Sequence, residues 1–363
     1  MLHLQLKTRS LMINNAVHSN GNLTIDNLKC LRAEYLYNSC SNCQEICPTD
    51  AIYLANNKRF ALTPSACIDC NACVGVCPTN AINTAQFDPN TFVLKFSATD
   101  ENKLSCKKNT PCLRVFNVEQ LIAMGIRNDK VVCDMAHCEE CEVNANNNVH
   151  DSIIETIDEA NQFLSSTGME KQITTEYEKV ETGRRELFKR FVKDVNEIKE
   201  DFEITEIFDA SSPIPVHRQL LQNSLKKHIE DFPNQKPTES FSFTKNKTID
   251  FMSCDNCGEC VQFCPTHALT NTSDKDAILF ENAKCIACGI CSDICKPNSF
   301  GNKEELDIVT MAFGRAEIAI QHRFELCTEC KVSFPQKESE TICTRCKDFV
   351  THNSDLFTMA KDM

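Results

Sequence analysis

The spacing of hydrophobic residues predicts two short helices and two strands between residues 91 and 165. Apolar side chains recur three or four residues apart over 118–126 and again over 152–164, as on the buried face of a helix. Short apolar runs at 91–96 and 130–133 indicate strands. We therefore expect a small α/β unit over 91–165.

A polar, acidic stretch follows over residues 166–245. Within it, apolar residues from 187 to 202 fall at helical spacing, and a second helix is expected over 216–229, after two prolines. We interpret the stretch as a helical, charged linker whose helices pack on the neighbouring domains. The alternative is a docking surface for a partner subunit, because grooves on partner proteins accept helices with one apolar stripe.

Cysteine dominates the composition of this chain. The 363 residues contain 25 cysteines, nine glycines and no tryptophan. The glycine-rich phosphate-binding motifs of nucleotide-binding proteins are missing from the sequence. The net charge of −13 argues against nucleic-acid binding, and no run of 18 apolar residues predicts a membrane span. We therefore expect the chemistry to be carried by sulfur.

The cysteine count also bears on the cellular compartment. An odd number of cysteines argues against a disulfide framework, and residues 1–19 lack the continuous apolar stretch of a secretory signal. Thiols remain reduced in the cytosol. We therefore expect thiolate ligands in a cytoplasmic protein.

The cysteines fall into six groups, and a cysteine-free span separates Cys141 from Cys254. The first two groups match the fourth and fifth in their spacing, which indicates an internal duplication. Three of these four groups end in cysteine and proline, followed by threonine, a polar residue and alanine.

The spacing C-x2-C-x2-C-x3-C-P is typical of ligands to [4Fe–4S] clusters. Three closely spaced cysteines wrap one cluster, and the fourth binds the other cluster of the pair. We expect the fourth cysteine to start a helix that leads away from the cluster. Tetrahedral zinc, which is also bound by C-x2-C pairs, is the alternative.

On these motifs, residues 30–90 and 250–300 resemble two-cluster bacterial ferredoxins. The resemblance implies an α+β fold with two ferredoxin-like dicluster modules and four [4Fe–4S] clusters. The implied ligand sets are Cys47, Cys67, Cys70 and Cys73; Cys30, Cys40, Cys43 and Cys77; Cys254, Cys257, Cys260 and Cys295; and Cys264, Cys285, Cys288 and Cys291.

The sequence departs from the ferredoxin pattern at two positions. Tyr37 occupies the slot of the first cysteine in the N-terminal module, and Cys30, seven residues upstream, is the expected substitute ligand. A three-iron cluster is the alternative there. Lys296 separates Cys295 from Pro297, and we expect this insertion only to shift the start of the following helix.

Five further cysteines lie in the small α/β unit. Cys133 falls inside a predicted strand, where a free cysteine is usually a core residue. The other four fall on predicted loops, and we expect them to bind a fifth [4Fe–4S] cluster; Cys106 remains the alternative to Cys133 as the unused thiol. Similar segments lie beside ferredoxin modules in subunits related to heterodisulfide reductase and hydrogenase complexes. A zinc site or no metal is the alternative. The four expected ligands are Cys106, Cys112, Cys138 and Cys141.

The last group consists of two C-x2-C pairs and resembles a zinc ribbon or a rubredoxin. Lys331 and Lys347 follow the pairs, where rubredoxins carry glycine, and these lysines offset the charge of four thiolates. We predict structural zinc; mononuclear iron or another cluster is the alternative. The expected metal ligands are Cys327, Cys330, Cys343 and Cys346.

These assignments divide the chain into five segments. We expect an N-terminal dicluster module over 1–90, the small α/β cysteine-rich unit over 91–165, the helical linker over 166–245, a second dicluster module over 246–310, and a zinc-ribbon or rubredoxin-like segment over 311–363.

Clusters closed by four thiolates pass electrons and leave no coordination site for a substrate. We therefore expect a multi-cluster electron-transfer protein, more a non-catalytic subunit than an enzyme, that relays electrons between redox partner proteins. The resemblance extends to iron–sulfur subunits of cytoplasmic oxidoreductases, including molybdopterin enzymes such as formate dehydrogenases. Two alternatives are a cluster carrier or redox regulator, and an enzyme with an open-site cluster beside Tyr37. No nucleic-acid partner or membrane span is expected.

Overall fold

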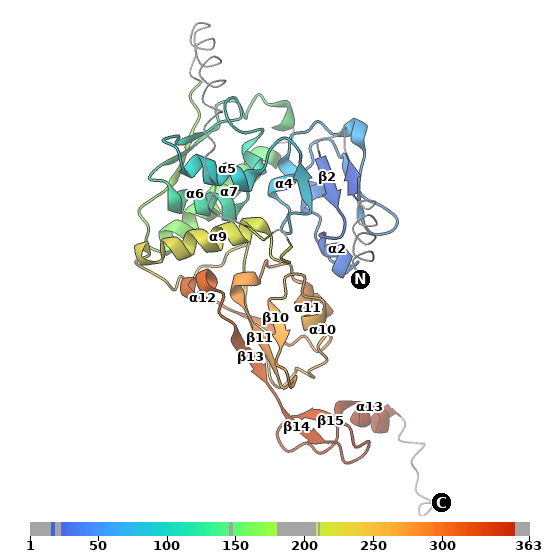
Figure 1. Cartoon of the computed structure of the whole chain (residues 1–363). Coiled ribbons are helices and arrows are strands. Elements are labelled where there is room, and N and C mark those ends of the chain that lie inside the picture. The colour runs from blue at the N-terminus through green and yellow to red at the C-terminus, as the bar shows by residue number, and fades with distance from the viewer. Residues whose placement is uncertain (1–15, 19–22, 145–147, 180–207, 210, 353–363) are drawn as a thin grey trace, which may run out of the picture.

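The computed structural model describes residues 16–18, 23–144, 148–179, 208–209 and 211–352. The helix expected over 187–202 lies outside these residues. Figure 1 shows the N-terminal module and the middle unit side by side, and helix α9 (Val216–Lys227) lies between the middle unit and the second module. The C-terminal hairpin and helix project from the far end of the second module.

The N-terminal module is built from short antiparallel strands and one-turn helices; here and below, η denotes a 3-10 helix. Alternate side chains of a strand face the same side, so Leu23 and Ile25 are buried while Thr24 and Asp26 are partly exposed. Strand β2 pairs with both β1 and β5, and β3 pairs with β4. The elements are β1 (Ala16–His18), β2 (Leu23–Asp26), α2 (Leu31–Glu34), α3 (Asn42–Glu45), β3 (Ile52–Leu54), β4 (Phe60–Leu62), η2 (Pro64–Ala66), α4 (Ala72–Gly75) and β5 (Ile82–Thr84).

The middle unit contains a parallel sheet in the order β6-β7-β8. The helices expected over 118–126 and 152–164 and the strand expected over 130–133 are confirmed as α6, α7 and β7. A capping box between Asn117 and Gln120 fixes the start of α6. The elements are β6 (Lys103–Leu104), η3 (Leu113–Val115), α6 (Val118–Arg127), β7 (Val131–Asp134), η4 (Glu142–Asn144), α7 (Asn148–Ser166) and β8 (Ile173–Glu176).

The strand predicted over 91–96 is wrong, because these residues belong to helix α5 (Pro89–Ser97). Asp88 caps the helix by accepting hydrogen bonds from the backbone N–H groups of Asn90 and Thr91. Proline at the first helical position favours the same start. Val93 and Phe96, three residues apart, are both buried. The β-branched and aromatic residues favour a strand, but the N-terminal cap and the burial of one helical face outweigh that preference.

The second module repeats the layout of the first. Strands β9 and β12 pair as β2 and β5 do, and β10 pairs with β11 as β3 does with β4. Strand β13, within the segment that we assigned to the ribbon, extends this sheet by pairing with β11. The elements are η5 (Ile229–Asp231), β9 (Asn246–Ile249), α10 (Glu259–Gln262), β10 (Leu269–Asn271), β11 (Ala277–Phe280), η6 (Asn282–Lys284), α11 (Ile290–Ile294), β12 (Phe300–Lys303), α12 (Ile308–Phe313) and β13 (Glu317–Gln321).

The C-terminal ribbon consists of β14 (Arg323–Leu326), β15 (Ser333–Gln336) and α13 (Thr344–His352). It has its own small core of Cys327, Phe334 and Cys343. By contrast, the N-terminal module and the middle unit share one continuous core. The mixture of helices with several small sheets is the α+β fold that the sequence predicts.

None of the described helices has both the length and the apolar character that crossing a membrane requires.

Candidate iron–sulfur centres and a four-cysteine metal site

All four cysteine runs of the two modules end in the same hydrogen-bonded turn. In each turn, the sulfur of the fourth cysteine accepts a hydrogen bond from the backbone N–H four residues later. Such bonds stabilise a thiolate, because the acceptor carries the charge. The donor–acceptor pairs are Ala51 N to Cys47 Sγ at 3.3 Å, Ala81 N to Cys77 Sγ at 3.3 Å, Ala268 N to Cys264 Sγ at 3.2 Å and Ser299 N to Cys295 Sγ at 3.3 Å.

The residue before each donor adopts a left-handed backbone conformation, which closes the turn. The φ angle is 52° at Asp50, 53° at Asn80, 53° at His267 and 55° at Asn298. Asp, Asn and His are the side-chain-bearing residues most often found in this region. The polar residue of the repeated motif is therefore explained by the backbone that it must adopt.

The expected helix after each fourth cysteine is wrong. The short helices α3, α4, α10 and α11 precede these cysteines, and the left-handed residue then turns the chain into a strand. The expectation that Lys296 shifts a helix start falls with it. Cys295 keeps the same turn although its proline is displaced by one position.

In the N-terminal module, Cys30, Cys40, Cys43 and Cys77 lie close together. Burial raises the pKa of Cys40, and the charges of Cys77 and Cys30 raise it further. Burial and the charges of these same neighbours also raise the pKa of Cys43. Cys30 lies at the start of α2, whereas 76% of the surface of Tyr37 is exposed.

The other N-terminal set gathers Cys47, Cys67, Cys70 and Cys73. Burial raises the pKa of Cys70, followed by the charges of Cys47 and Cys67. Cys73 is buried, which raises its pKa, and the charges of all three other cysteines raise it further. The charge of Cys43, from the neighbouring set, has the same effect. The two N-terminal sets therefore lie next to each other.

The second module shows the same pairing. Burial raises the pKa of Cys260 to about 12, and the neighbouring charges that add to this include Cys254, Cys257 and Cys295. For Cys288, burial and then Cys285, Cys264 and Cys291 raise the pKa to about 12. The charge of Cys291 also raises the pKa of Cys260, so these two sets adjoin as well.

The structure brings together the four loop cysteines of the middle unit. Burial raises the pKa of Cys112 to about 12, and Cys138 and Cys106 contribute. Burial also raises the pKa of Cys138, and the charges of Cys106 and Cys141 raise it further. Cys133 lies in β7 with 1% of its surface exposed, beside Cys138.

The middle set adjoins the N-terminal module through a very close backbone contact. Helix α4, which carries Cys73, packs on η3, which Cys112 precedes. A Cβ atom at Gly75 would lie 2.0 Å from the carbonyl oxygen of Arg114, so only glycine fits there. Cys70 also lies within electrostatic range of Cys112.

Buried polar side chains that the sequence analysis did not identify hold the ligand loops in place. Arg32 donates to the carbonyl oxygens of Leu36 (3.0 Å) and Cys40 (3.3 Å). Arg218, fully buried in α9, donates to the carbonyl oxygen of Cys285 at 2.8 Å and pairs with Glu119 of α6. No local pattern marks Arg218, because its partners are distant in sequence.

The four C-terminal cysteines converge more tightly than the others. Their sulfur atoms all lie within 4.8 Å of one another, and the sulfurs of Cys330 and Cys343 are 3.8 Å apart. A tetrahedron with Zn–S bonds of about 2.3 Å has edges of about 3.8 Å. Among the described residues, only this group is compact enough for a single ion.

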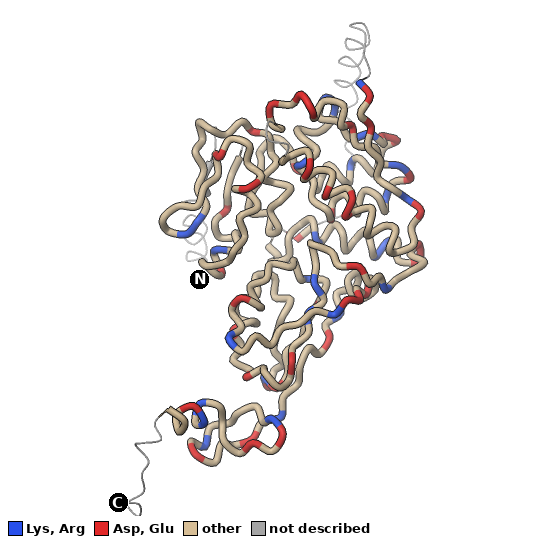
Figure 2. Tube along the Cα trace, turned by 180° about the vertical axis from the view of Figure 1, so that it is seen from behind, with Lys and Arg blue, Asp and Glu red and all other residues tan. Residues whose placement is uncertain are grey.

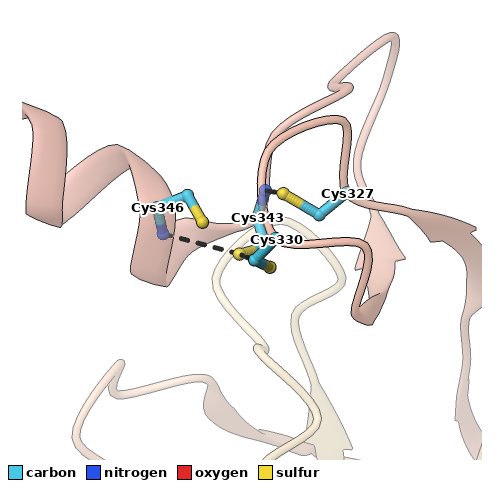
Figure 3. Close-up of side chains that lie close together, drawn as sticks. All are labelled: Cys327, Cys330, Cys343 and Cys346. Atoms are coloured by element: carbon cyan, nitrogen blue, oxygen red, sulfur yellow. Dashed lines mark hydrogen bonds between the residues drawn. The ribbon is translucent and has the colours of Figure 1, made fainter.

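Backbone N–H groups stabilise charge in this site as well (Figure 3). Cys343 N–H donates to the sulfur of Cys327 at 3.3 Å, and Cys346 N–H donates to the sulfur of Cys343 at 3.4 Å. Although burial opposes the change, backbone hydrogen bonds from Cys330 and Cys343 lower the pKa of Cys327 to about 6. Four cysteine sulfurs around one point form a four-cysteine metal site.

Comparison with known protein families decides the nature of the two modules. A family model described as a 4Fe-4S dicluster domain matches residues 38–82, and another with the same description matches residues 246–296. Both modules are 4Fe-4S dicluster domains. No curated protein matches the chain.

The dicluster domains make this chain an iron–sulfur electron-transfer protein. The matched residues include the ligand runs of both modules, but Cys30 and the cysteines of the middle unit lie outside them. The donor sets fit the clusters, because each brings four cysteines within electrostatic range of one another.

Proposed function

We propose that this protein relays electrons between redox partner proteins, as a subunit or dedicated partner of an oxidoreductase. The observation that carries the proposal is the adjacency of the ligand sets. Cys112 of the middle unit lies near Cys70, and Cys73 lies near Cys43, so three sets follow one another. A row of closed clusters provides successive stations for electrons and no substrate site.

Two of the cysteines in the five ligand sets are exposed. Each belongs to a set that has one neighbouring set. Cys141 belongs to the middle set, and Cys257 to the outer set of the second domain. Acidic residues flank each of them, Glu139 and Glu142 at the first and Asp255 at the second, and Figure 2 shows acidic positions on both the middle unit and the second domain. We propose that partners with a basic rim dock at these two sites, because complementary charge speeds association.

The geometry gives little support to an enzyme with an open iron site at Tyr37. The side chain of Tyr37 is exposed, and Cys30 lies near Cys40, Cys43 and Cys77 to supply the fourth thiolate. A cavity of about 640 Å³ borders Cys77, but Tyr37 is not among the residues that line it. We therefore propose Cys30 as the ligand.

For the C-terminal site we propose structural zinc. Its four sulfurs all lie within 4.8 Å of one another, as ligands to a single zinc ion would. Lys347, which we expected to offset the charge of the thiolates, forms an ion pair with Glu340 at 2.6 Å. Zinc in such closed sites stabilises the fold and carries no redox chemistry. Mononuclear iron is the alternative, and the metal analysis below distinguishes the two ions.

A reductive titration tests the proposed function. The protein, purified without oxygen, is reduced stepwise with dithionite and reoxidised while the clusters are followed by electron paramagnetic resonance. A relay predicts reversible one-electron reduction with all iron retained over the cycle. A cluster carrier predicts instead that iron and sulfide pass to an apo-ferredoxin added to the sample, and this outcome would contradict the proposal.

A further inference from the structure

The two dicluster domains meet at a small apolar contact. Leu31 of the first domain packs with Ile286 and Ile290 of the second, and all three are buried. Cys40 and Cys288, proposed ligands in different domains, pack against the same cluster of side chains. The contact therefore places the inner set of one domain against the inner set of the other.

One side chain spans this contact. Asn38 is buried, with 1% of its surface exposed, and its two side-chain atoms face opposite domains. Its Oδ1 accepts a hydrogen bond from the backbone N–H of Cys40 at 3.1 Å. Its Nδ2 donates to the carbonyl oxygen of Cys288 at 3.3 Å.

We propose that electrons cross between the two domains at this contact, and that Asn38 is the positioning residue that sets the gap. This inference rests on the proposed relay function. It joins the separate rows of ligand sets into one path that runs from the middle unit through both domains. Along this path the ligand sets follow in the order Cys106/Cys112/Cys138/Cys141, Cys47/Cys67/Cys70/Cys73, Cys30/Cys40/Cys43/Cys77, Cys264/Cys285/Cys288/Cys291 and Cys254/Cys257/Cys260/Cys295.

Asparagine is suited to this position because its amide is both a donor and an acceptor. One short side chain can therefore bond to a backbone N–H on one side and to a backbone carbonyl on the other. Electronic coupling falls steeply with distance, and it falls less steeply along a hydrogen-bonded path than across a gap through space. The apolar residues around the amide exclude water from the same contact.

Two variants distinguish the contributions of the two hydrogen bonds of Asn38. Asn38→Asp keeps an oxygen for Cys40 N–H but removes the donor to Cys288 and places a carboxylate against its carbonyl oxygen. Asn38→Ala removes both bonds. Asn57→Ala, in the exposed turn between β3 and β4, is the matched control, since Asn57 bonds only locally to Arg59 N–H.

The readout is magnetic coupling between reduced clusters in the holo-protein, measured by electron paramagnetic resonance after iron has been counted. We expect the parent protein and Asn57→Ala to show spin–spin broadening between the two inner clusters. Asn38→Asp and Asn38→Ala should weaken that broadening, because the gap between the two domains widens. Iron content should remain unchanged in Asn38→Asp, because its loop around Cys40 is retained.

A second pair of variants keeps the inference testable even if both Asn38 variants lose iron. The double variant Cys285→Ser/Cys291→Ser removes the inner cluster of the second domain, because two of its four ligands are lost, and Cys254→Ser/Cys257→Ser removes the outer one. The part of the N-terminal broadening that comes from the second domain should disappear when the inner cluster of that domain is removed, and it should remain when the outer one is removed. Broadening between the two N-terminal clusters persists in both variants. A spectrum that is unchanged when the inner cluster of the second domain is removed, or in both Asn38 variants with full iron, overturns the inference while leaving the relay within each domain intact. Parent protein without reducible clusters contradicts the proposed function itself.

Discussion

At the scale of single residues, the fourth ligand of the first N-terminal set is the position at which the chain departs most from ferredoxins. Tyr37 fills the usual slot but turns its ring to solvent, and Cys30 lies at the start of α2, near the other three sulfurs. Arg32, two residues further on, donates to the Cys40 carbonyl oxygen and holds the two loops together.

Replacing Cys30 with serine should therefore convert one cluster to a three-iron form. We expect the loss of about one iron per chain, because a cubane cluster has four irons held by four protein ligands. Iron analysis and electron paramagnetic resonance of the oxidised protein measure the change. Tyr37→Phe is the control and should keep the full iron content. A three-iron signal in Tyr37→Phe but not in Cys30→Ser would assign the ligand to Tyr37.

At the scale of elements, the cysteine spacing predicted the ligand loops, but it did not predict how the elements pack. Helix α5 was missed because its β-branched and aromatic residues favour a strand, whereas the Asp88 cap and Pro89 decide for a helix. Asn38 and Arg218 carried no sequence signal, because both bond to residues of another domain. Local patterns predicted which cysteines gather into sets, but not the turns that follow them, and long-range contacts have to be seen in the structure.

The contact between α4 and η3 leads to a prediction about Gly75. Alanine there would place a methyl group against the backbone of Arg114, so the elements must separate. We expect a loss of about 1–3 kcal/mol in the free energy of unfolding, the usual cost of overpacking. Denaturant unfolding of the holo-protein measures it. Gln262→Ala, at the equivalent exposed position of α10, should be nearly neutral, and equal effects of the two would argue against the packing role.

The C-terminal ribbon should depend on its metal for folding. Its own core is small, and in such domains the free energy of metal binding is also free energy of folding. Removal of the ion with a zinc chelator should unfold residues 323–352 and leave the dicluster domains protected. Hydrogen exchange followed by mass spectrometry locates the change. Unaltered exchange over β14, β15 and α13 after metal loss would contradict a structural role.

At the scale of the whole molecule, helix α9 connects the middle unit with the second domain. Arg218 pairs with Glu119 of α6 and donates to the carbonyl oxygens of Phe243 and Cys285. Burial opposes ionisation of Glu119, but Arg218 and His217 hold the pKa of its carboxyl below the usual value. This ion pair therefore stabilises the assembly above the ordinary pKa of a glutamate, and the contribution is lost as the pH falls through the lowered value.

Breaking this pair should loosen the whole assembly. Arg218→Met leaves the Glu119 charge buried without its main partner, and we expect a loss of about 3–5 kcal/mol. The double variant Arg218→Met with Glu119→Gln should recover part of that loss, because no charge then remains buried. Thermal unfolding at neutral pH measures both variants. A double variant that is no more stable than the single one would show that the lost hydrogen bonds, and not the stranded charge, dominate.

The most direct test of the account is the metal and sulfide content of protein purified without oxygen. Five cubane clusters and one ribbon ion predict about twenty irons, about twenty sulfides and about one zinc per chain. About sixteen irons would remove the cluster proposed for the middle unit and keep the two dicluster domains. A colourless protein that contains only zinc, with no acid-labile sulfide, would contradict the electron relay altogether.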